Sequence, residues 1–200
     1  ISPQQIVVSA GAKQSVYQAL MSLIDAGDEV ILFAPYWMTY KDQVVLAGGV
    51  PVVVKTNGDE AFVPNLEEIS RAISSKTKVI LVNSPSNPTG TLTPPERMKQ
   101  IVAAASGRAL IISDEVYHGL VYEGRAHSIR EFARDAVVIN SFSKRFAMTG
   151  WRLGYCILPT WLVRPVQKLQ QNLFISPPDF AQYAAIAALQ HAGADVERMR

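Results

Sequence analysis

The sequence predicts a three-layer α/β fold, in which helices cover both faces of a seven-stranded, mostly parallel sheet. Short apolar, β-branched segments alternate with segments of helical periodicity along the chain. Polar turns follow several of the apolar segments, as they do at the edge where open α/β sheets bind ligands. The expected strands are Ile6–Ala10, Glu29–Ala34, Val50–Lys55, Lys78–Asn83, Ala109–Ser113, Ala136–Ser141 and Leu153–Leu158.

The composition fits one globular domain that spans residues 1–200, with 48% hydrophobic and 18% charged residues. The net charge of +2 argues neither for nor against a polyanionic partner, but the basic residues form no run, so we expect no nucleic-acid partner. No apolar run is long enough to predict a membrane span, and we expect a cytoplasmic protein. The single cysteine, Cys156, lies in an apolar run and is expected to be buried and inert.

The first predicted strand leads into Gly11-Ala12-Lys13-Gln14 and then into a helix that continues to Leu23. A helix that starts on a glycine turn exposes free N–H groups and the positive end of its dipole. This turn is therefore a candidate phosphate site. The alternative is a plain connection between a strand and a helix.

The second strand leads into Pro35-Tyr36-Trp37 and a helix to about Ala47. Trp37 would lie at the ligand-binding edge, where an aromatic side chain can stack on a flat heterocycle. The alternative is a half-buried core tryptophan.

After the third strand, Asn65 is predicted to cap a helix that ends near Ile73. The fourth strand runs into the loop Ser84–Gly90, which holds two prolines and is a candidate for a cis X–Pro bond. This loop can hold the amide of Asn87 at the sheet edge. Asn before Pro is also common in turns for local reasons.

A helix is predicted at Pro94–Ala105, and the strand that follows, Ala109–Ser113, leads directly into Asp114. A carboxylate at the end of an apolar strand is costly to bury unless it meets a cation. Tyr117 follows three residues later and would reach the same ligand from another side. The alternative is that Asp114 only caps the next turn.

Lys144 follows the sixth strand, in a loop with Ser141 and Ser143. A lysine at that rim is expected to be partly desolvated, so that its neutral amine can attack a carbonyl and form a Schiff base. Arg152 adds a planar cation suited to a phosphate. An amine nucleophile beside a phosphate cluster indicates pyridoxal 5′-phosphate (PLP), whose pyridinium nitrogen would be the cation for Asp114. Helices at Trp161–Phe174 and Pro178–Ala192 complete the chain.

The stretch from Ser141 to Gly154 resembles the lysine-attachment signature of the class I and II PLP-dependent aminotransferases. The resemblance covers nearly the whole chain, because further matching motifs occur in the family's order: Gly11-Ala12-Lys13-Gln14, Pro35-Tyr36-Trp37, Asn87-Pro88-Thr89-Gly90 and Asp114-Glu115-x-Tyr117. The sequence looks most similar to bacterial aspartate aminotransferases, some of which accept prephenate. The family's fold implies that Leu153–Leu158 is the one antiparallel strand.

The resemblance implies a role for each matching residue. Lys144 would bond PLP, Asp114 would pair with the ring nitrogen, and Tyr117 and Asn87 would bind the phenolic oxygen. Trp37 would stack on the ring, while the backbone of Gly11, Ala12 and Lys13, with Ser141, Ser143 and Arg152, would hold the phosphate. Lys13, Trp37 and Asn87 are expected to face the substrate, and no metal is expected.

The implied reaction moves an amino group between an amino acid and a 2-oxo acid by a ping-pong scheme, in a homodimer. The distal carboxylate of aspartate would suit Lys13. The family's C-terminal small domain and N-terminal arm are not in this sequence, so we expect the chain alone to bind PLP weakly and to transaminate poorly. A C–S β-lyase, another enzyme of the same fold, and an inactive PLP-binding or dimerisation domain stay as alternatives. A dinucleotide-binding domain does not fit, because the turn at Gly11 lacks three glycines.

Overall fold

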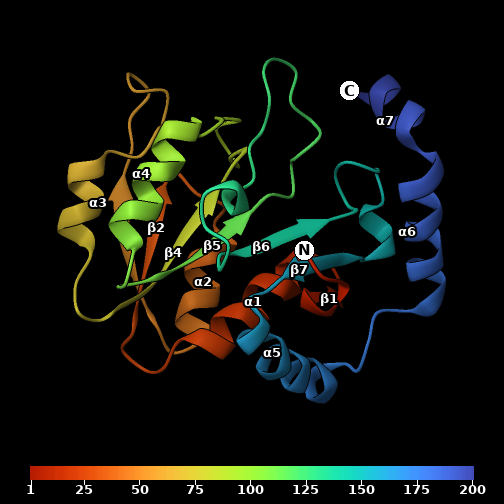
Figure 1. Ribbon diagram of the computed structural model, residues 1–200, viewed down its shortest axis with the longest axis horizontal. Helices are drawn as coiled ribbons and strands as arrows, with labels where there is room; N and C mark the ends of the chain where they lie inside the picture. Colours follow the sequence, from red (N-terminus) through yellow and green to blue (C-terminus); the bar gives the residue numbers. More distant parts are fainter.

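The computed structural model describes residues 1–200 as a three-layer α/β/α arrangement around one seven-stranded sheet (Figure 1). The strands follow the apolar segments of the sequence: β1 Ile6–Ser9, β2 Glu29–Ala34, β3 Val50–Lys55, β4 Thr77–Asn83, β5 Leu110–Asp114, β6 Val137–Ser141 and β7 Gly154–Ile157. Their spatial order is β1-β7-β6-β5-β4-β2-β3. Only β7 runs antiparallel to its two neighbours, as predicted.

Seven α-helices connect and flank the strands: α1 Ala12–Leu23, α2 Thr39–Leu46, α3 Leu66–Ala72, α4 Pro95–Ala105, α5 Thr160–Leu173, α6 Asp179–His191 and α7 Gly193–Met199. Three short 3₁₀ helices lie at Pro3–Gln5, Ile129–Glu131 and Thr149–Trp151. Helices α1, α2 and α5 pack on one face of the sheet, and α3 and α4 pack on the other. In Figure 1, α6 and α7 stand at the end of the molecule beside β1 and β7.

The period of two along each strand divides the core between the two faces of the sheet. In β2, Val30 and Leu32 join the cluster under α1, α2 and α5, while Ile31 joins the cluster under α3 and α4. All three are fully buried. Each such side chain contributes roughly 1.5–3 kcal/mol through burial. This two-sided burial explains why the parallel strands read as continuous apolar runs.

The local predictions at turns are mostly confirmed. Asn65 caps α3, because its Oδ1 accepts from the N–H groups of Glu67 and Glu68. The loop after β4 has cis bonds at Ser84–Pro85 and Asn87–Pro88, and a third, unpredicted cis bond joins Ala34 to Pro35.

One helix of the structure was missing from the sequence expectations, while the expectation for the single cysteine is confirmed. Helix α7 was not predicted, and it continues almost directly from α6. Cys156 is buried as expected, and burial raises its pKa to about 12. None of the helices is both long and apolar enough to cross a bilayer.

Candidate functional site

The parallel sheet brings its chemistry to one edge, because the carboxyl ends of parallel strands point the same way. The segments that leave β1, β2, β4, β5 and β6 carry Lys13, Trp37, Asn87, Asp114 and Lys144, respectively. Strand β7 runs the other way, so its amino end, which follows Arg152, starts at that same edge.

These residues line one cavity of about 190 Å³ at that edge. It contains every site residue expected from the sequence except Gly11, which precedes Ala12. The full lining is Ala12, Lys13, Trp37, Tyr40, Asn83, Asn87, Asp114, Val116, Tyr117, Ser141, Ser143, Lys144, Thr149 and Arg152.

One end of the cavity is rich in donors suited to an anion. Helix α1 begins at Ala12, so the N–H groups of Ala12 and Lys13 have no carbonyl within the helix to bind, and Gly11 offers no side-chain cap. Gly11 has a φ of 92°, a conformation that favours glycine. A Cβ on Gly11 would overlap Nη2 of Arg152, so the glycine also makes room for the guanidinium.

Arg152 reaches this end from a left-handed backbone conformation with a φ of 51°. Its Nη1 donates to the carbonyl of Thr149 at 2.8 Å and its Nη2 donates to the carbonyl of Ala10 at 3.4 Å. A guanidinium has five N–H donors, so others stay free for a ligand. Next to it, Gly154 lies so close to the start of α1 that a Cβ would sit 2.7 Å from the nitrogen of Ala12.

The serines of the loop after β6 form a short hydrogen-bonded pair, with Ser141 Oγ donating to Ser143 Oγ at 3.0 Å. The N–H of Ser143 in turn donates to Ser141 Oγ at 3.1 Å. The pair fixes the beginning of the loop that carries Lys144.

Asp114 supplies the only carboxylate of the cavity lining, and it is 4% exposed. Its Oδ2 accepts from the hydroxyl of Tyr40 at 2.7 Å, and its Oδ1 accepts from the N–H of Val116 at 3.1 Å. Burial raises the pKa of Asp114, while these two hydrogen bonds lower it. The carboxylate caps the next turn, as one interpretation of Asp114 predicted, and it also lines the cavity, while its pairing with a cationic ligand stays a prediction.

Asn87 and Tyr117 lie together, because Asn87 Nδ2 is 3.3 Å from the hydroxyl of Tyr117. Asn83 holds the backbone on both sides of this pair, at Asn87 and at Asp114. Its Oδ1 accepts from the N–H of Asn87 at 2.7 Å, and its Nδ2 donates to the carbonyl of Asp114 at 2.9 Å. Two polar side chains from different strands therefore converge on one point of the cavity.

Lys144 lies at the mouth of the cavity, with its Nζ 5.9 Å from the centre of the Tyr117 ring. Its side chain is exposed, so the expectation of partial desolvation is wrong for this chain. The physical reason is that the loop is itself largely exposed, as Arg145 and Ala147 beside Lys144 also are. Lys13 also lies at this rim, 5.1 Å from the ring centre of the half-buried Trp37.

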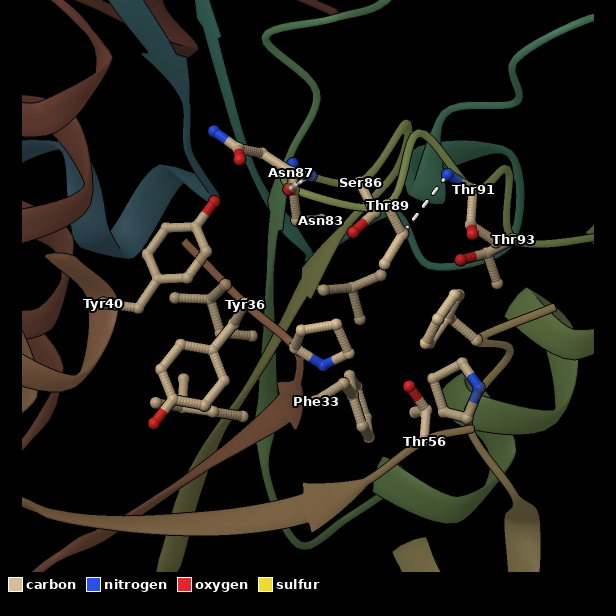
Figure 2. A pocket seen from close by; sticks show the side chains of 16 residues that line it. Phe33, Tyr36, Tyr40, Thr56, Asn83, Ser86, Asn87, Thr89, Thr91 and Thr93 are labelled. Carbon is tan, nitrogen blue, oxygen red and sulfur yellow. Dashed lines mark hydrogen bonds between the residues drawn. The ribbon is translucent and has the colours of Figure 1, made fainter. Parts of the chain in front are cut away.

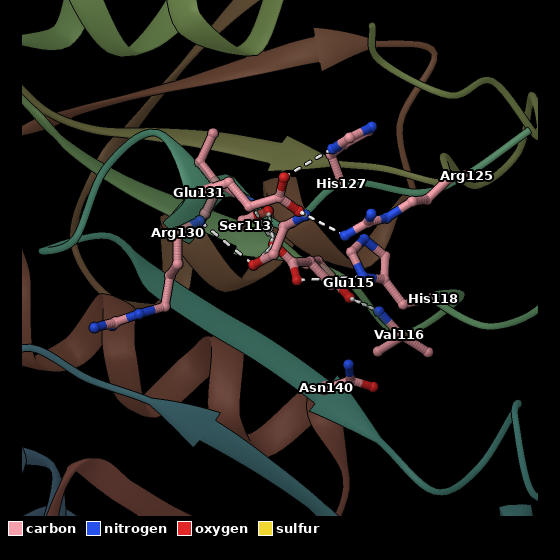
Figure 3. A network of polar contacts seen from close by, with 12 residues as sticks. Ser113, Glu115, Val116, His118, Arg125, His127, Arg130, Glu131 and Asn140 are labelled. Atoms are coloured by element: carbon pink, nitrogen blue, oxygen red, sulfur yellow. Dashed lines mark hydrogen bonds and ion pairs between the residues drawn. The ribbon is translucent and has the colours of Figure 1, made fainter. Parts of the chain in front are cut away.

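A polar network behind the cavity anchors the segment that carries Asp114 and Tyr117 (Figure 3). Glu115 Oε1 accepts from Ser113 Oγ at 3.0 Å, from Ser128 Oγ at 3.1 Å and from the N–H of Ile129 at 2.9 Å. Its Oε2 lies 3.5 Å from Nδ1 of His118. Burial raises the pKa of Glu115 to about 7 although these hydrogen bonds oppose the shift.

Sequence reasoning missed four lining residues, namely Tyr40, Asn83, Val116 and Thr149. The signal for Asn83 was its place at the end of a strand. The signal for Tyr40 was its position three residues after Trp37, which is one helical turn.

The lining can hold a flat ring with an anionic group at one end. Three exposed cations, Lys13, Lys144 and Arg152, surround the opening, and the free N–H groups of α1 add to the anion site. The buried carboxylate of Asp114 lines the same cavity, where it suits a protonated ring nitrogen. The donors and aromatic faces match the chemistry of PLP, and no three acidic, His or Cys side chains are grouped as metal ligands.

Comparison with known proteins gives matches along the whole chain. Residues 1–200 match the family model described as "Aminotransferase class I and II". The aspartate aminotransferase of Thermotoga maritima is 45% identical over 194 residues, which are 95% of this chain and 52% of that protein. A probable aspartate/prephenate aminotransferase of Thermus aquaticus is 38% identical, over 98% of this chain and 52% of its own length.

The solved structures agree with this match. The aspartate aminotransferase of Thermus thermophilus with maleate superposes with a TM-score of 0.97 at 37% identity, over 99% of this chain and 53% of that one. The chain therefore spans about half the length of the curated relatives that it matches.

Proposed function

The chain belongs to the class I and II aminotransferase family, and from this premise we propose that it forms the cofactor-binding part of a PLP-dependent aminotransferase. The cofactor of this family is PLP. The observation that carries the proposal is the single cavity that gathers Asp114 and Tyr117 from the end of β5 and Lys144 and Arg152 from the connection between β6 and β7. A binding module without chemistry has no need for that set.

The residues present fit PLP, and the close approach of Arg152 to Gly11 is the most specific sign of this fit. The guanidinium of Arg152 occupies the space that a Cβ on Gly11 would fill, next to the free N–H groups of Ala12 and Lys13. These groups, with Ser141 and Ser143, would hold the phosphate. Trp37 would lie against the ring.

The remaining lining residues are proposed to bind the two polar atoms of the ring. Asn87 and Tyr117 converge, so both would donate to the ring's phenolic oxygen. Asp114, buried and held at both oxygens, would keep a proton on the ring nitrogen.

When bound, the cofactor supplies a conjugated ring that accepts the electrons released at the α-carbon of the amino acid. The amine of Lys144 would bond the cofactor's aldehyde at rest and, once displaced by substrate, would act as the general base that removes and returns the proton. Its exposed position at the mouth leaves it accessible to substrate.

We propose aspartate, or another dicarboxylic amino acid, and a 2-oxo acid as the substrates of the whole protein. The names of the relatives from Thermotoga maritima and Thermus aquaticus support this. Lys13 supports it as well, because its ammonium stands beside Trp37 at the rim, where it can pair with a second carboxylate.

A homodimer is proposed as the working assembly. Apolar side chains of α6 are exposed, with Phe180 at 66%, Ile186 at 50% and Leu189 at 64%. They flank an apolar groove of about 560 Å³ between α6 and strands β1 and β7. Residues 1–200 are proposed to form one domain, and the cytoplasmic location stays a prediction.

The test is to load the chain with PLP, add L-aspartate together with a second 2-oxo acid, 2-oxoglutarate, which accepts the amino group, and measure oxaloacetate. Formation of oxaloacetate that is lost in Lys144→Ala supports the aminotransferase. We expect slow turnover from this chain alone, and rates of roughly 1–10³ per second would contradict that expectation. Pyruvate and ammonia from a cysteine conjugate would instead favour a β-lyase. A PLP-bound chain that forms no product would favour a binding or dimerisation domain.

A further inference from the structure

We infer that Tyr40 is a positioning residue, which holds the carboxylate of Asp114 ionised and oriented for a protonated ring nitrogen; this inference rests on the proposed function. The resemblance to a known family assigned no role to Tyr40. Its hydroxyl lies 2.7 Å from Asp114 Oδ2 and is the only side-chain donor to that carboxylate.

The geometry leaves the right number of free acceptor sites on Asp114. Each carboxylate oxygen can accept about two hydrogen bonds. Oδ2 takes one from Tyr40 and Oδ1 takes one from the N–H of Val116, so the carboxylate is fixed at both oxygens. One acceptor site on each oxygen stays available, and Asp114 lines the cavity. The carboxylate is thus held in one orientation before any ligand arrives.

The position of Tyr40 is itself set by its neighbours. It is 2% exposed, and its ring meets that of Trp37 edge to face, with the centres 5.3 Å apart. Gln43, one helical turn later, donates to the carbonyl of Lys13 at 2.8 Å and ties α2 to the start of α1. Tyr40 therefore connects the aromatic wall of the cavity to its carboxylate.

Tyr40 also separates two cavities. It lines the main cavity and a smaller one of about 30 Å³, whose wall it shares with Tyr36 (Figure 2). In Figure 2 the hydroxyl of Tyr40 points away from that of Tyr36 and toward the side of Asn83 and Asn87. Removal of the whole ring would join the two cavities, so phenylalanine is the informative replacement.

The electrostatics predict that loss of the Tyr40 hydroxyl favours the protonated form of Asp114. Burial favours the neutral acid at Asp114, and the hydrogen bond from Tyr40 favours the charged carboxylate. Tyr40 stays a donor at ordinary pH, because its burial and the nearby Asp114 raise its own pKa. Without its hydroxyl, a proton would move from a ring nitrogen toward Asp114, and the ring would accept electrons less readily.

Other titratable groups near Asp114 must be separated from this effect. Lys13, Tyr117, Lys144 and Arg152 share the cavity lining, and all of them stay in place in Tyr40→Phe. Glu115 is the adjacent residue, but its carboxylate binds Ser113, Ser128 and Ile129 on the other side of the strand.

The test compares Tyr40→Phe with Tyr122→Phe, a matched loss of a phenol hydroxyl from a side chain that is 81% exposed. First, the carboxyl carbon of Asp114 is titrated by ¹³C NMR in the cofactor-free chain and assigned with Asp114→Asn. We expect a higher midpoint in Tyr40→Phe and the wild-type midpoint in Tyr122→Phe. An unchanged midpoint in Tyr40→Phe overturns the inference, whatever the chain binds.

Second, binding of PLP is compared with binding of its 1-deaza analogue, in which carbon replaces the ring nitrogen. We expect Tyr40→Phe to weaken PLP about tenfold, the lower end for a hydrogen bond to a charged group, and to leave the analogue unchanged. Equal losses for both ligands would make Tyr40 merely structural. If Tyr40→Phe raises the midpoint of Asp114 but the wild-type chain binds no PLP, the proposed function is refuted and the control of Asp114 by Tyr40 stays intact.

Discussion

The buried carboxylate of Glu115 gives the free energy of unfolding a pH dependence that can be worked out from the structure. The side chain is 4% exposed, and its pKa is raised from 4.5 to about 7. At a pH between these two pKa values, Glu115 is deprotonated in the unfolded chain and still protonated in the native state, so the native state binds more protons. The contribution of Glu115 to stability is therefore complete below pH 4.5 and falls as the pH rises toward 7. The difference of about 2.5 pKa units corresponds to about 3 kcal/mol.

His118 opposes this slope. Burial lowers its pKa from 6.5, so the unfolded chain binds the proton more readily below that pH, and stability falls as the pH falls. The pKa of Asp114 is raised, so this residue changes the free energy of unfolding with pH in the same direction as Glu115 does. Asp114 is present in both wild type and Glu115→Gln, so its contribution cancels when the two are compared. The difference between wild type and Glu115→Gln isolates Glu115, because the amide oxygen can keep the three hydrogen bonds to Oε1.

Urea unfolding followed by tryptophan fluorescence at pH 5, 6, 7 and 8 measures this difference. We expect Glu115→Gln to gain stability relative to wild type as the pH rises, by about 3 kcal/mol across the window. Glu67→Gln is the control, since that side chain is 80% exposed beside Arg71, and it should follow the wild-type curve. Parallel curves for wild type and Glu115→Gln would refute the assigned burial cost.

Three further predictions concern the phosphate end, a helix cap and the thiol. Gly11→Ala should lower the affinity for PLP about tenfold, because the new Cβ displaces Arg152, and should leave the affinity for pyridoxal, which lacks the phosphate, unchanged. The control is Gly107→Ala, where φ is 70° and no atom lies near the new Cβ. It should lower the free energy of unfolding by about 1–2 kcal/mol and leave the affinity for PLP unchanged. Asn65→Ala should lower the free energy of unfolding by about 1 kcal/mol in urea titrations, since two N–H groups of α3 lose their acceptor. Cys156 should react with a thiol reagent only as fast as the chain unfolds, and rapid modification of the native chain would contradict its burial.

The strand ends and most of the cavity were predictable because each expected residue follows a strand directly in sequence. Lys13, Asp114 and Lys144 need only the rule that parallel strands end at one edge. Arg152 needed more, since its placement depends on the antiparallel direction of β7, which the family resemblance supplied and the strand pairing confirms.

The missed residues depend on tertiary packing. Asn83 pairs in register with Asp114 across β4 and β5, and no local pattern states that register. Tyr40 reaches Asp114, 74 residues away in sequence, only because α2 is packed on the sheet. The exposure of Lys144 was mispredicted because an apolar strand before a loop does not show what covers the loop.

The most direct test of the central claim is to add PLP, reduce with borohydride and map the attached group by mass spectrometry of peptides. This covalent trap records even weak binding. We predict attachment concentrated on Lys144, lost in Lys144→Ala and retained in Lys99→Ala, whose ammonium instead pairs with Glu96 on α4. A uniform distribution of the label over surface lysines, unchanged by Lys144→Ala, would contradict the assignment of Lys144 as the residue that bonds the cofactor.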